Sequence, residues 1–161
     1  FILNFHIITI IYLYLNISNR KMQLTIKTTK KQELIDITDK IQEIVKKSEV
    51  KEGLCLIYAQ HTTAAILVNE NEERLMDDIE QFLEELTPSN NHYKHDDIEK
   101  RNCPPNERRN APAHLKAMLI GPSKIIPIKN GKLDLGVWQS IILAEFDGPR
   151  NRNIITTIIK S

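Results

Sequence analysis

Three histidines in this 161-residue chain stand beside other polar side chains and could act together. His61 follows the apolar run 54–59 and precedes two hydroxyl residues, and His114 stands near the start of a short predicted helix. His95 lies next to Asp96, a carboxylate that could orient an imidazole ring. Three imidazoles from separate elements could hold Zn²⁺ or another divalent ion with one open coordination position. Each could instead be a structural histidine, bonded to the backbone, solvated in a loop or partnered at a helix end.

A long strand predicted over residues 133–146 carries polar side chains among apolar ones. Gln139 and Glu145 fall on the same face of this strand as several apolar residues, where a buried polar group needs a partner or a ligand. Trp138 faces the opposite side, as expected for packing, for an interface or for a platform on which a ligand stacks.

The turn that follows, residues 147–152, contains Arg150 and Arg152. Two guanidinium groups could bind a phosphate or a carboxylate with paired hydrogen bonds, although the turn could also be a solvated hairpin loop. The sequence contains no Gly-x-Ser-x-Gly elbow, no Gly-rich phosphate loop and no Rossmann fingerprint. Nucleotide-binding folds and serine hydrolases are therefore not expected.

Composition is typical of a single globular domain. The chain is 27% charged and 41% hydrophobic, with a net charge of +1, so it offers no broad basic surface for a nucleic-acid backbone. Two cysteines cannot form a disulfide framework in a chain of this length and indicate free thiols in a reducing compartment. We therefore expect a cytoplasmic protein that binds neither nucleic acid nor membranes.

The first 21 residues differ from the rest of the chain. They are mostly apolar and carry no charge before Arg20, but polar residues interrupt the run too often for a membrane span. A signal peptide would begin with positive charge and end in small residues, and neither feature is present. We interpret residues 1–21 as an upstream extension or disordered segment and Met22 as the start of the domain; a degenerate targeting or anchor segment is the alternative.

Alternating and continuous apolar runs predict the strands. Residues 23–28 and 34–38 are expected to pair as a hairpin, and Asn130-Gly131 is a strong signal for a second hairpin. The expected strands cover residues 23–28, 34–38, 54–59, 64–68, 124–128, 133–146 and 153–159.

Helical spacing appears between these strands. A short helix is expected after a cap at Thr38 or Asp39, and a longer one over residues 71–86, where apolar residues recur every three or four positions. A third helix is expected over residues 113–119, after a long polar loop of the kind that is functional or disordered. Strands at both ends of a helical middle indicate an α+β domain with a largely antiparallel sheet.

A series of short motifs then runs along the chain. They are, in order, Gln60-His61-Thr62-Thr63-Ala64-Ala65, Asn69-Glu70, Tyr93-x-His95-Asp96, His114-Leu115-Lys116-Ala117, Gly121-x-Ser123, Gly136-x-Trp138-Gln139 and Glu145-Phe146-Asp147-x-x-Arg150. This series resembles the YjbQ-like family, also called the secondary thiamine-phosphate synthase family. The resemblance covers residues 22–160 and leaves residues 1–21 outside it.

The resemblance implies one compact α+β domain that forms a homotrimer, with a three-histidine pocket that holds a metal in some members. For this chain we expect a divalent metal there: zinc, or magnesium or manganese. It also implies a transferase activity that joins a pyrimidine diphosphate to a thiazole phosphate, an activity that is secondary in the family. The alternatives are a trimeric metal- or small-ligand-binding protein without efficient catalysis and a metal-dependent phosphohydrolase.

The expected site combines these observations, for a small phosphorylated or diphosphorylated substrate. The candidate catalytic residues are His61, Glu70, His95, His114, Gln139 and Glu145. The candidate substrate- and phosphate-binding residues are Thr62, Thr63, Asn69, Asp96, Trp138 and Arg150. The metal ligands are expected to be His61, His95 and His114. Glu70 or Glu145 would be the acid or base, and Arg150 would stabilise the charge that leaves with the diphosphate.

Overall fold

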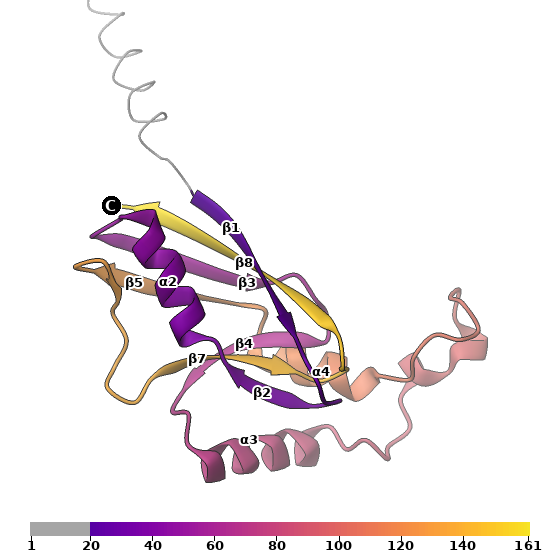
Figure 1. The fold of residues 1–161 in the computed structure, drawn as a ribbon. Helices are drawn as coiled ribbons and strands as arrows, with labels where there is room; N and C mark the ends of the chain where they lie inside the picture. The colour runs from indigo at the N-terminus through magenta and orange to yellow at the C-terminus, as the bar shows by residue number, and fades with distance from the viewer. Residues whose placement is uncertain (1–19) are drawn as a thin grey trace, which may run out of the picture.

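A computed structural model describes residues 20–161 of the protein (Figure 1). The interpretation of residues 1–21 therefore lies almost wholly outside the described residues and stays a prediction. The first strand begins at Arg20, two residues before the expected start of the domain, and its backbone pairs with the last strand from that residue onward.

Two antiparallel sheets form the framework. The larger has five strands in the order β1-β8-β3-β5-β6, and the smaller has three in the order β2-β7-β4. The strands are β1 (Arg20–Lys27), β2 (Glu33–Asp36), β3 (Gly53–Ala59), β4 (Ala64–Asn69), β5 (Ser123–Lys129), β6 (Lys132–Leu133), β7 (Ser140–Glu145) and β8 (Asn151–Lys160). The expected α+β class with antiparallel sheets is confirmed.

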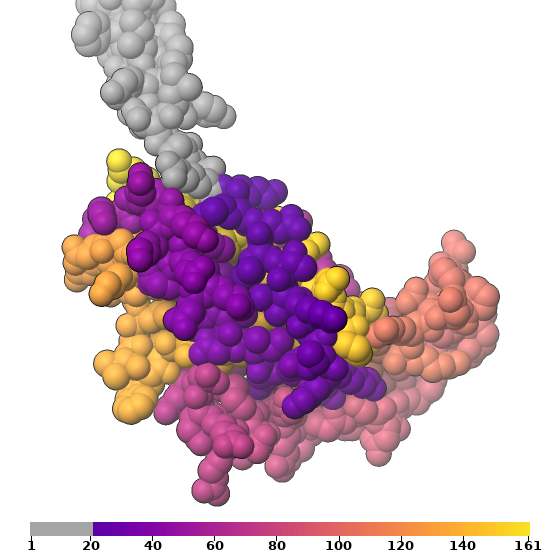
Figure 2. All heavy atoms as spheres, in the orientation of Figure 1, coloured from indigo at the N-terminus to yellow at the C-terminus, as the bar shows by residue number. Residues whose placement is uncertain are grey.

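Three α-helices accompany the sheets within residues 20–161. They are α2 (Thr38–Ser48), α3 (Glu73–Leu86) and α4 (Ala111–Ile120), with short 3₁₀ turns η1 (Lys94–Asp96) and η2 (Ile98–Lys100) between the last two. Helix α2 lies across the larger sheet, whereas the segment between α3 and α4 projects beyond both sheets (Figures 1 and 2). None of the helices in this part of the chain combines the length and apolar character that crossing a membrane requires.

The main core lies where α2 and the two sheets face one another. It is rich in isoleucine, because β-branched side chains suit strands and pack densely between layers. Ile41 of α2, Ile57 of β3 and Ile141 of β7 are all completely buried there. A second cluster, which includes Ala65, Leu83 and Ala117, joins α3 and α4 to the smaller sheet.

Both cysteines are free thiols, as the sequence predicts. Cys55 lies in the main core, where burial raises the pKa of its thiol to about 12. Cys103 is half-buried in the loop before α4 rather than exposed as a loop thiol would be.

Two predicted strand arrangements are wrong. Strands β1 and β2 do not form a hairpin: β1 pairs with β8 in the larger sheet, and β2 pairs with β7 in the smaller one. The chain crosses between sheets after Lys27 because Thr28 is completely buried and bonds to the distant residue Arg150. The sequence pattern cannot show this, because the alternation of apolar and polar residues in β1 and β2 is compatible with a hairpin as well as with pairing to β8 and β7.

The expected long strand over residues 133–146 is also wrong. The chain leaves β6 at Leu133 and turns before β7 begins at Ser140. Gln139 closes this turn, because its main-chain N–H donates to the carbonyl of Gly136 and its side-chain oxygen accepts the N–H of Gly136 at 2.8 Å. Gln139 is therefore exposed and does not share a sheet face with the buried Glu145.

The start of α2 differs in detail. The helix begins at Thr38, but neither Thr38 nor Asp39 caps it: the carboxylate of Asp36 accepts the N–H of Thr38 at 2.8 Å. The hydroxyl of Thr38 instead accepts the N–H of Ile141 at 2.8 Å and ties the helix to β7.

Candidate functional site

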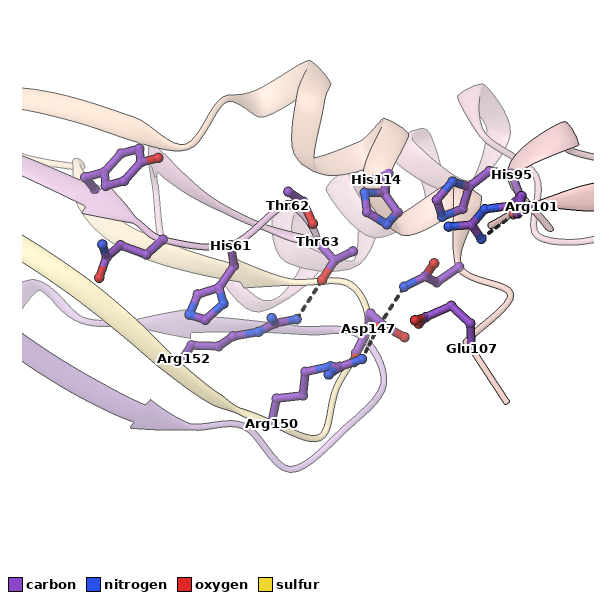
Figure 3. A pocket seen from close by; sticks show the side chains of 13 residues that line it. His61, Thr62, Thr63, His95, Arg101, Glu107, His114, Asp147, Arg150 and Arg152 are labelled. Atoms are coloured by element: carbon purple, nitrogen blue, oxygen red, sulfur yellow. Dashed lines mark hydrogen bonds and ion pairs between the residues drawn. The ribbon is translucent and has the colours of Figure 1, made fainter. Parts of the chain in front are cut away.

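One pocket brings together all three predicted histidines and three arginines. It has a volume of about 680 Å³ and lies where β3, β4 and β8 meet the loop before α4 (Figure 3). The lining residues are Tyr58, Gln60, His61, Thr62, Thr63, His95, Arg101, Glu107, Asn110, His114, Asp147, Arg150 and Arg152. A cavity of this size suits a small metabolite.

His61 lies in the link between β3 and β4, beside the start of β8. Its Nε2 accepts the main-chain N–H of Asn153 at 2.8 Å. Burial, with the positive charges of Arg152 and Arg150, lowers the pKa of His61 below its ordinary value, while Glu145 acts in the opposite direction. The imidazole is therefore neutral at pH 7, with its proton on Nδ1.

His95 and His114 form a pair on the other side of the pocket. Their ring centroids are 4.7 Å apart and their planes meet at 61°, edge to face. The pairing arises because Asp96, at the end of η1, accepts the N–H of Ala111 at 3.0 Å and so holds η1 against the first turn of α4.

The electrostatic surroundings keep His114 neutral. Burial is the largest cause that lowers the pKa of His114, followed by the nearby His95, and Arg101 acts in the same direction. Asp147 and Asp96 oppose these effects without cancelling them. A neutral imidazole at pH 7 can accept a proton from a bound molecule.

Arg152 is the most deeply buried cation of the site. Its Nε donates to Glu145 Oε2 at 2.5 Å, and its Nη2 donates to Glu145 Oε1 and, at 2.9 Å, to the hydroxyl of Thr63. Glu145 also accepts the hydroxyl of Thr28 and the N–H of Asp147. A completely buried carboxylate thus fixes the guanidinium in one orientation.

Asp147 organises the rim. Its side chain accepts from Arg150 Nη2 at 2.6 Å, from Asn110 Nδ2 at 3.0 Å and from Arg108 Nη1 at 3.2 Å. These bonds outweigh burial and hold the pKa of Asp147 below its ordinary value. The carboxylate therefore links the loop before α4 to the arginines of the β7–β8 turn.

Gly148 makes that turn possible. A Cβ atom at this position would lie 2.2 Å from the carbonyl oxygen of Lys30 and 2.9 Å from the hydroxyl of Thr28. The turn can approach the link between β1 and β2 only because residue 148 has no side chain.

Half of the residues expected from the sequence line the pocket. The structure brings together His61, Thr62, Thr63, His95, His114 and Arg150. Glu145 lies directly behind the wall, bound to Arg152, and Asp96 caps α4 rather than facing the cavity. These two residues therefore position other groups of the site.

Four expected residues lie elsewhere. Asn69 ends β4 and Glu70 follows it, so Asn69 lies roughly 17 Å along the strand from Ala64 at the pocket end. Gln139 and Trp138 lie in the turn before β7, where Trp138 is 72% exposed. They do not line this pocket, because the strand expected to carry Trp138 and Gln139 is interrupted and because β4 leads away from the pocket.

Sequence reasoning missed several lining residues. Arg101, Glu107 and Asn110 come from the polar loop, which has no periodicity that would show where its side chains point. The sequence identifies Arg152 as a guanidinium of the turn and Glu145 as a polar residue that needs a partner, but it does not show that these two side chains pair. The only sequence signal for that pair is Glu145, an acid at the end of the apolar run of β7, whereas Arg152 stands between two asparagines.

The expected three-histidine metal site is only partly assembled. Among residues 20–161 no group of three or more His, Cys, Asp or Glu side chains is arranged to hold a metal ion. His95 and His114 are adjacent, but the Nε2 lone pair of His61 is occupied by Asn153. The present arrangement does not fit a three-imidazole ligand set, and a divalent metal stays a prediction.

Comparison with known proteins finds relatives that are similar to this chain in sequence and in fold. A UPF0047 protein of Archaeoglobus fulgidus is 47% identical over 134 residues, which are 83% of this chain and 97% of the relative. The UPF0047 protein YugU of Bacillus subtilis is 37% identical over 130 residues, 80% of this chain and 91% of the relative. A solved YbjQ-like protein of unknown function from Sulfolobus solfataricus P2 has a TM-score of 0.81 and 39% identity, covering 90% of this chain and 99% of that one.

The family comparison covers the whole domain. Residues 22–161 match the family described as UPF0047 protein YjbQ-like, a range that includes all of the sequence motifs. With the relatives above, this match shows that the chain belongs to the UPF0047 YjbQ-like family.

Proposed function

We propose that the protein is an enzyme that acts on a small phosphorylated or diphosphorylated metabolite. The observation that carries this proposal is the composition of the pocket: three arginines line the same cavity as the adjacent imidazoles of His95 and His114. Guanidinium groups bind phosphate oxygens with paired hydrogen bonds, and histidine is the commonest proton-transfer group at neutral pH.

The arginines and the histidines of the pocket would have different tasks. Arg150 and Arg152 would bind the phosphate and stabilise the charge that develops on a departing phosphate or diphosphate. His114, with its lowered pKa, would accept a proton from the reacting group at neutral pH. His95 stands next to it and would hold the ring in place or share the proton.

The finer proposal is the transferase reaction that the family resemblance implies. In that reaction a bond between the pyrimidine methylene carbon and a diphosphate oxygen breaks, the thiazole nitrogen bonds to the same carbon, and diphosphate leaves. This reaction needs anion stabilisation at the leaving group above all, which is the property that the arginines of the pocket supply.

The experiment is a turnover screen of phosphorylated metabolites, including that substrate pair, with phosphate and diphosphate release as the measurement. For a reaction in which the acceptor group loses a proton, His114→Asn should lower kcat by about 10²-fold or more with an unchanged Tm, as expected for the loss of a general base. The matched control is Glu70→Gln, which removes an acidic group at the far end of β4 and should leave turnover unchanged.

Other results would identify the alternatives. Thermal stabilisation by several metabolites without turnover would contradict catalysis and indicate a ligand-binding protein. Phosphate release from generic esters, with water as the acceptor, would indicate a phosphohydrolase. If His114→Asn lowers both kcat and Tm, the role of His114 is structural.

We also propose that the chain forms a homotrimer and works in the cytoplasm, as its sequence resemblance and free thiols indicate. Large apolar side chains are exposed and would be available for self-association: Phe82, Met118 and Trp138 are 58%, 68% and 72% exposed. Light scattering on the purified protein should give three times the mass of one chain, and a monomer mass would contradict the proposal.

A further inference from the structure

We propose that His61, Arg152 and Arg150 form a preset oxyanion subsite that binds one phosphoryl group, with His61 as a fixed hydrogen-bond donor rather than a base or a metal ligand. This inference rests on the proposed function and assigns the two ends of the same pocket to different tasks. One end holds the phosphoryl group, and the His95–His114 end does the proton chemistry.

The orientation of His61 is set by a group that can only donate. A main-chain N–H, that of Asn153, points at Nε2 from 2.8 Å, so Nε2 must carry the lone pair and Nδ1 the proton. A proton on Nε2 would set two donors against each other. The Nδ1–H group is on the opposite side of the ring and makes no hydrogen bond to any residue in the range 20–161.

Arg152 presents its remaining amino group in a similar way. Its Nε and Nη2 are occupied by Glu145 and Thr63, whereas Nη1 has no partner among the described residues. Thr156 Oγ1 is the only side-chain polar atom in that part of the chain that is both buried and unpartnered, so Nη1 must be accessible from the cavity that Arg152 lines. A side chain that is otherwise buried thus offers two N–H groups to a ligand.

Arg150 completes the subsite at the rim. Asp147 binds its Nε through the main-chain carbonyl at 2.9 Å and its Nη2 through the carboxylate, which leaves Nη1 without a partner among residues 20–161. The close-up shows the Arg152 side chain extending beneath His61 toward Thr63 and the Arg150 side chain extending toward Asp147 (Figure 3). Both guanidinium groups are near enough to His61 to lower the pKa of its ring. All three free groups are donors, and each is held by a contact already made, so little ordering is needed when an anion binds.

An acceptor-only ligand fits this set of donors. A phosphoryl group has several strong acceptor oxygens and negative charge, whereas a cation or a neutral hydroxyl would leave at least one charged donor unsatisfied. The same chemistry would accept inorganic phosphate, which is therefore a suitable probe of the subsite.

The first experiment reads the histidine tautomers by ¹⁵N NMR on the full chain, from pH 5.5 to pH 8. We expect His61 to keep a protonated Nδ1 and an unprotonated Nε2 at neutral pH, and inorganic phosphate to shift the Nδ1–H signal. A proton on Nε2 at neutral pH, or a phosphate response at His95 and His114 without one at His61, would overturn the assignment.

The second experiment uses two substitutions that keep different halves of the imidazole. His61→Asn places an amide N–H near the position of Nδ1, and His61→Gln places an amide oxygen near the position of Nε2, where it can accept from Asn153. We expect the Kd for inorganic phosphate to rise at least 10-fold in His61→Gln and about 3-fold or less in His61→Asn. His92→Gln, which alters an exposed histidine paired with Asp97, is the control and should leave Kd unchanged.

The outcomes separate the two proposals. Phosphate that binds equally well to the wild type and to His61→Gln overturns the subsite but leaves a phosphorylated substrate possible elsewhere in the pocket. A wild type that does not bind phosphate overturns both. Thermal unfolding of each variant, with a Tm close to that of the wild type, shows that a change in Kd reflects the site rather than the fold.

Discussion

The ring of His95 stands edge-on to the ring of His114 with 4.7 Å between the centroids, although one residue belongs to η1 and the other to α4. This contact has an electrostatic consequence, because protonation of one ring disfavours protonation of the other. The pKa of His114 is lowered by burial first and by His95 second.

Replacement of His95 should therefore raise the pKa of His114. In His95→Gln the electrostatic effect of the neighbouring ring is lost while burial remains, so the pKa of His114 should move toward its ordinary value without reaching it. An NMR titration of the His114 ring protons measures the shift, and His92→Gln provides the comparison. An unchanged pKa would mean that the two rings do not interact.

The free energy of unfolding should depend on pH in the range where the two neutral histidines, His61 and His114, take up protons. His61 and His114 both have pKa values below the ordinary 6.5, so the unfolded chain takes up protons first as the pH falls past 6.5. The free energy of unfolding should decrease from pH 7.5 to pH 5.5. Asp147, with its pKa held below 3.8, loses its stabilising contribution only in more acidic solution.

Urea unfolding at several pH values provides the measurement. The double variant His61→Asn/His114→Asn should show a flatter dependence between pH 7.5 and 5.5 than the wild type. The opposite slope, with stability increasing toward pH 5.5, would show that at least one of these histidines is charged in the folded protein.

Two buried threonines should respond in opposite ways to replacement by valine. Thr156 Oγ1 is buried without a partner, so Thr156→Val should raise the free energy of unfolding by about 1 kcal/mol. The hydroxyl of Thr28 bonds to Glu145 and to the N–H of Arg150, so Thr28→Val should lower it by about 1–3 kcal/mol. Chemical denaturation measures both, and destabilisation in Thr156→Val would indicate a bound water on that hydroxyl.

The buried pair Glu145–Arg152 should be strongly coupled. Glu145→Gln leaves a buried guanidinium without its counter-charge and should lower the free energy of unfolding by about 3–5 kcal/mol. The double variant Glu145→Gln/Arg152→Met should lose less than the sum of the two single losses, by about 0.5–3 kcal/mol. Additive losses would show that the two side chains do not stabilise each other.

Metal binding can be assigned to particular histidines by elemental mass spectrometry. We expect added zinc to bind at the adjacent pair, so that His95→Asn loses it and His61→Asn retains it, because Asn153 occupies Nε2 of His61. Loss of zinc in both variants would support the three-histidine ligand set that the sequence suggests.

The sequence predicts the elements of this fold better than their partners. The spacing of Leu75, Ile79 and Leu83 predicts α3, and apolar runs predict β3, β4 and β8, because local periodicity follows directly from backbone geometry. Pairing across sheets depends on distant contacts such as that between Thr28 and Arg150, which no local pattern contains.

For the candidate site too, the sequence shows residue types but not which residues meet in space. The histidine and Thr62–Thr63 positions stand out by residue type, and the structure places them in one pocket. Glu70 and Gln139 stand out equally well by type but lie away from it, since only the three-dimensional course of the chain distinguishes them. The loop residues Arg101 and Glu107 have no sequence signal, because a polar residue in a polar loop is unremarkable until the loop is positioned.

The position of β8 determines when the protein can acquire its site during synthesis. This last strand lies between β1 and β3, and its register joins Arg20 to Ile158. A nascent chain that has not yet emerged beyond Asn151 lacks both the strand that joins β1 to β3 in the larger sheet and the cationic side chain at residue 152. The larger sheet and the pocket therefore form only after the residues of β8 have been synthesised, and until then the apolar strands that precede it must be kept from other chains.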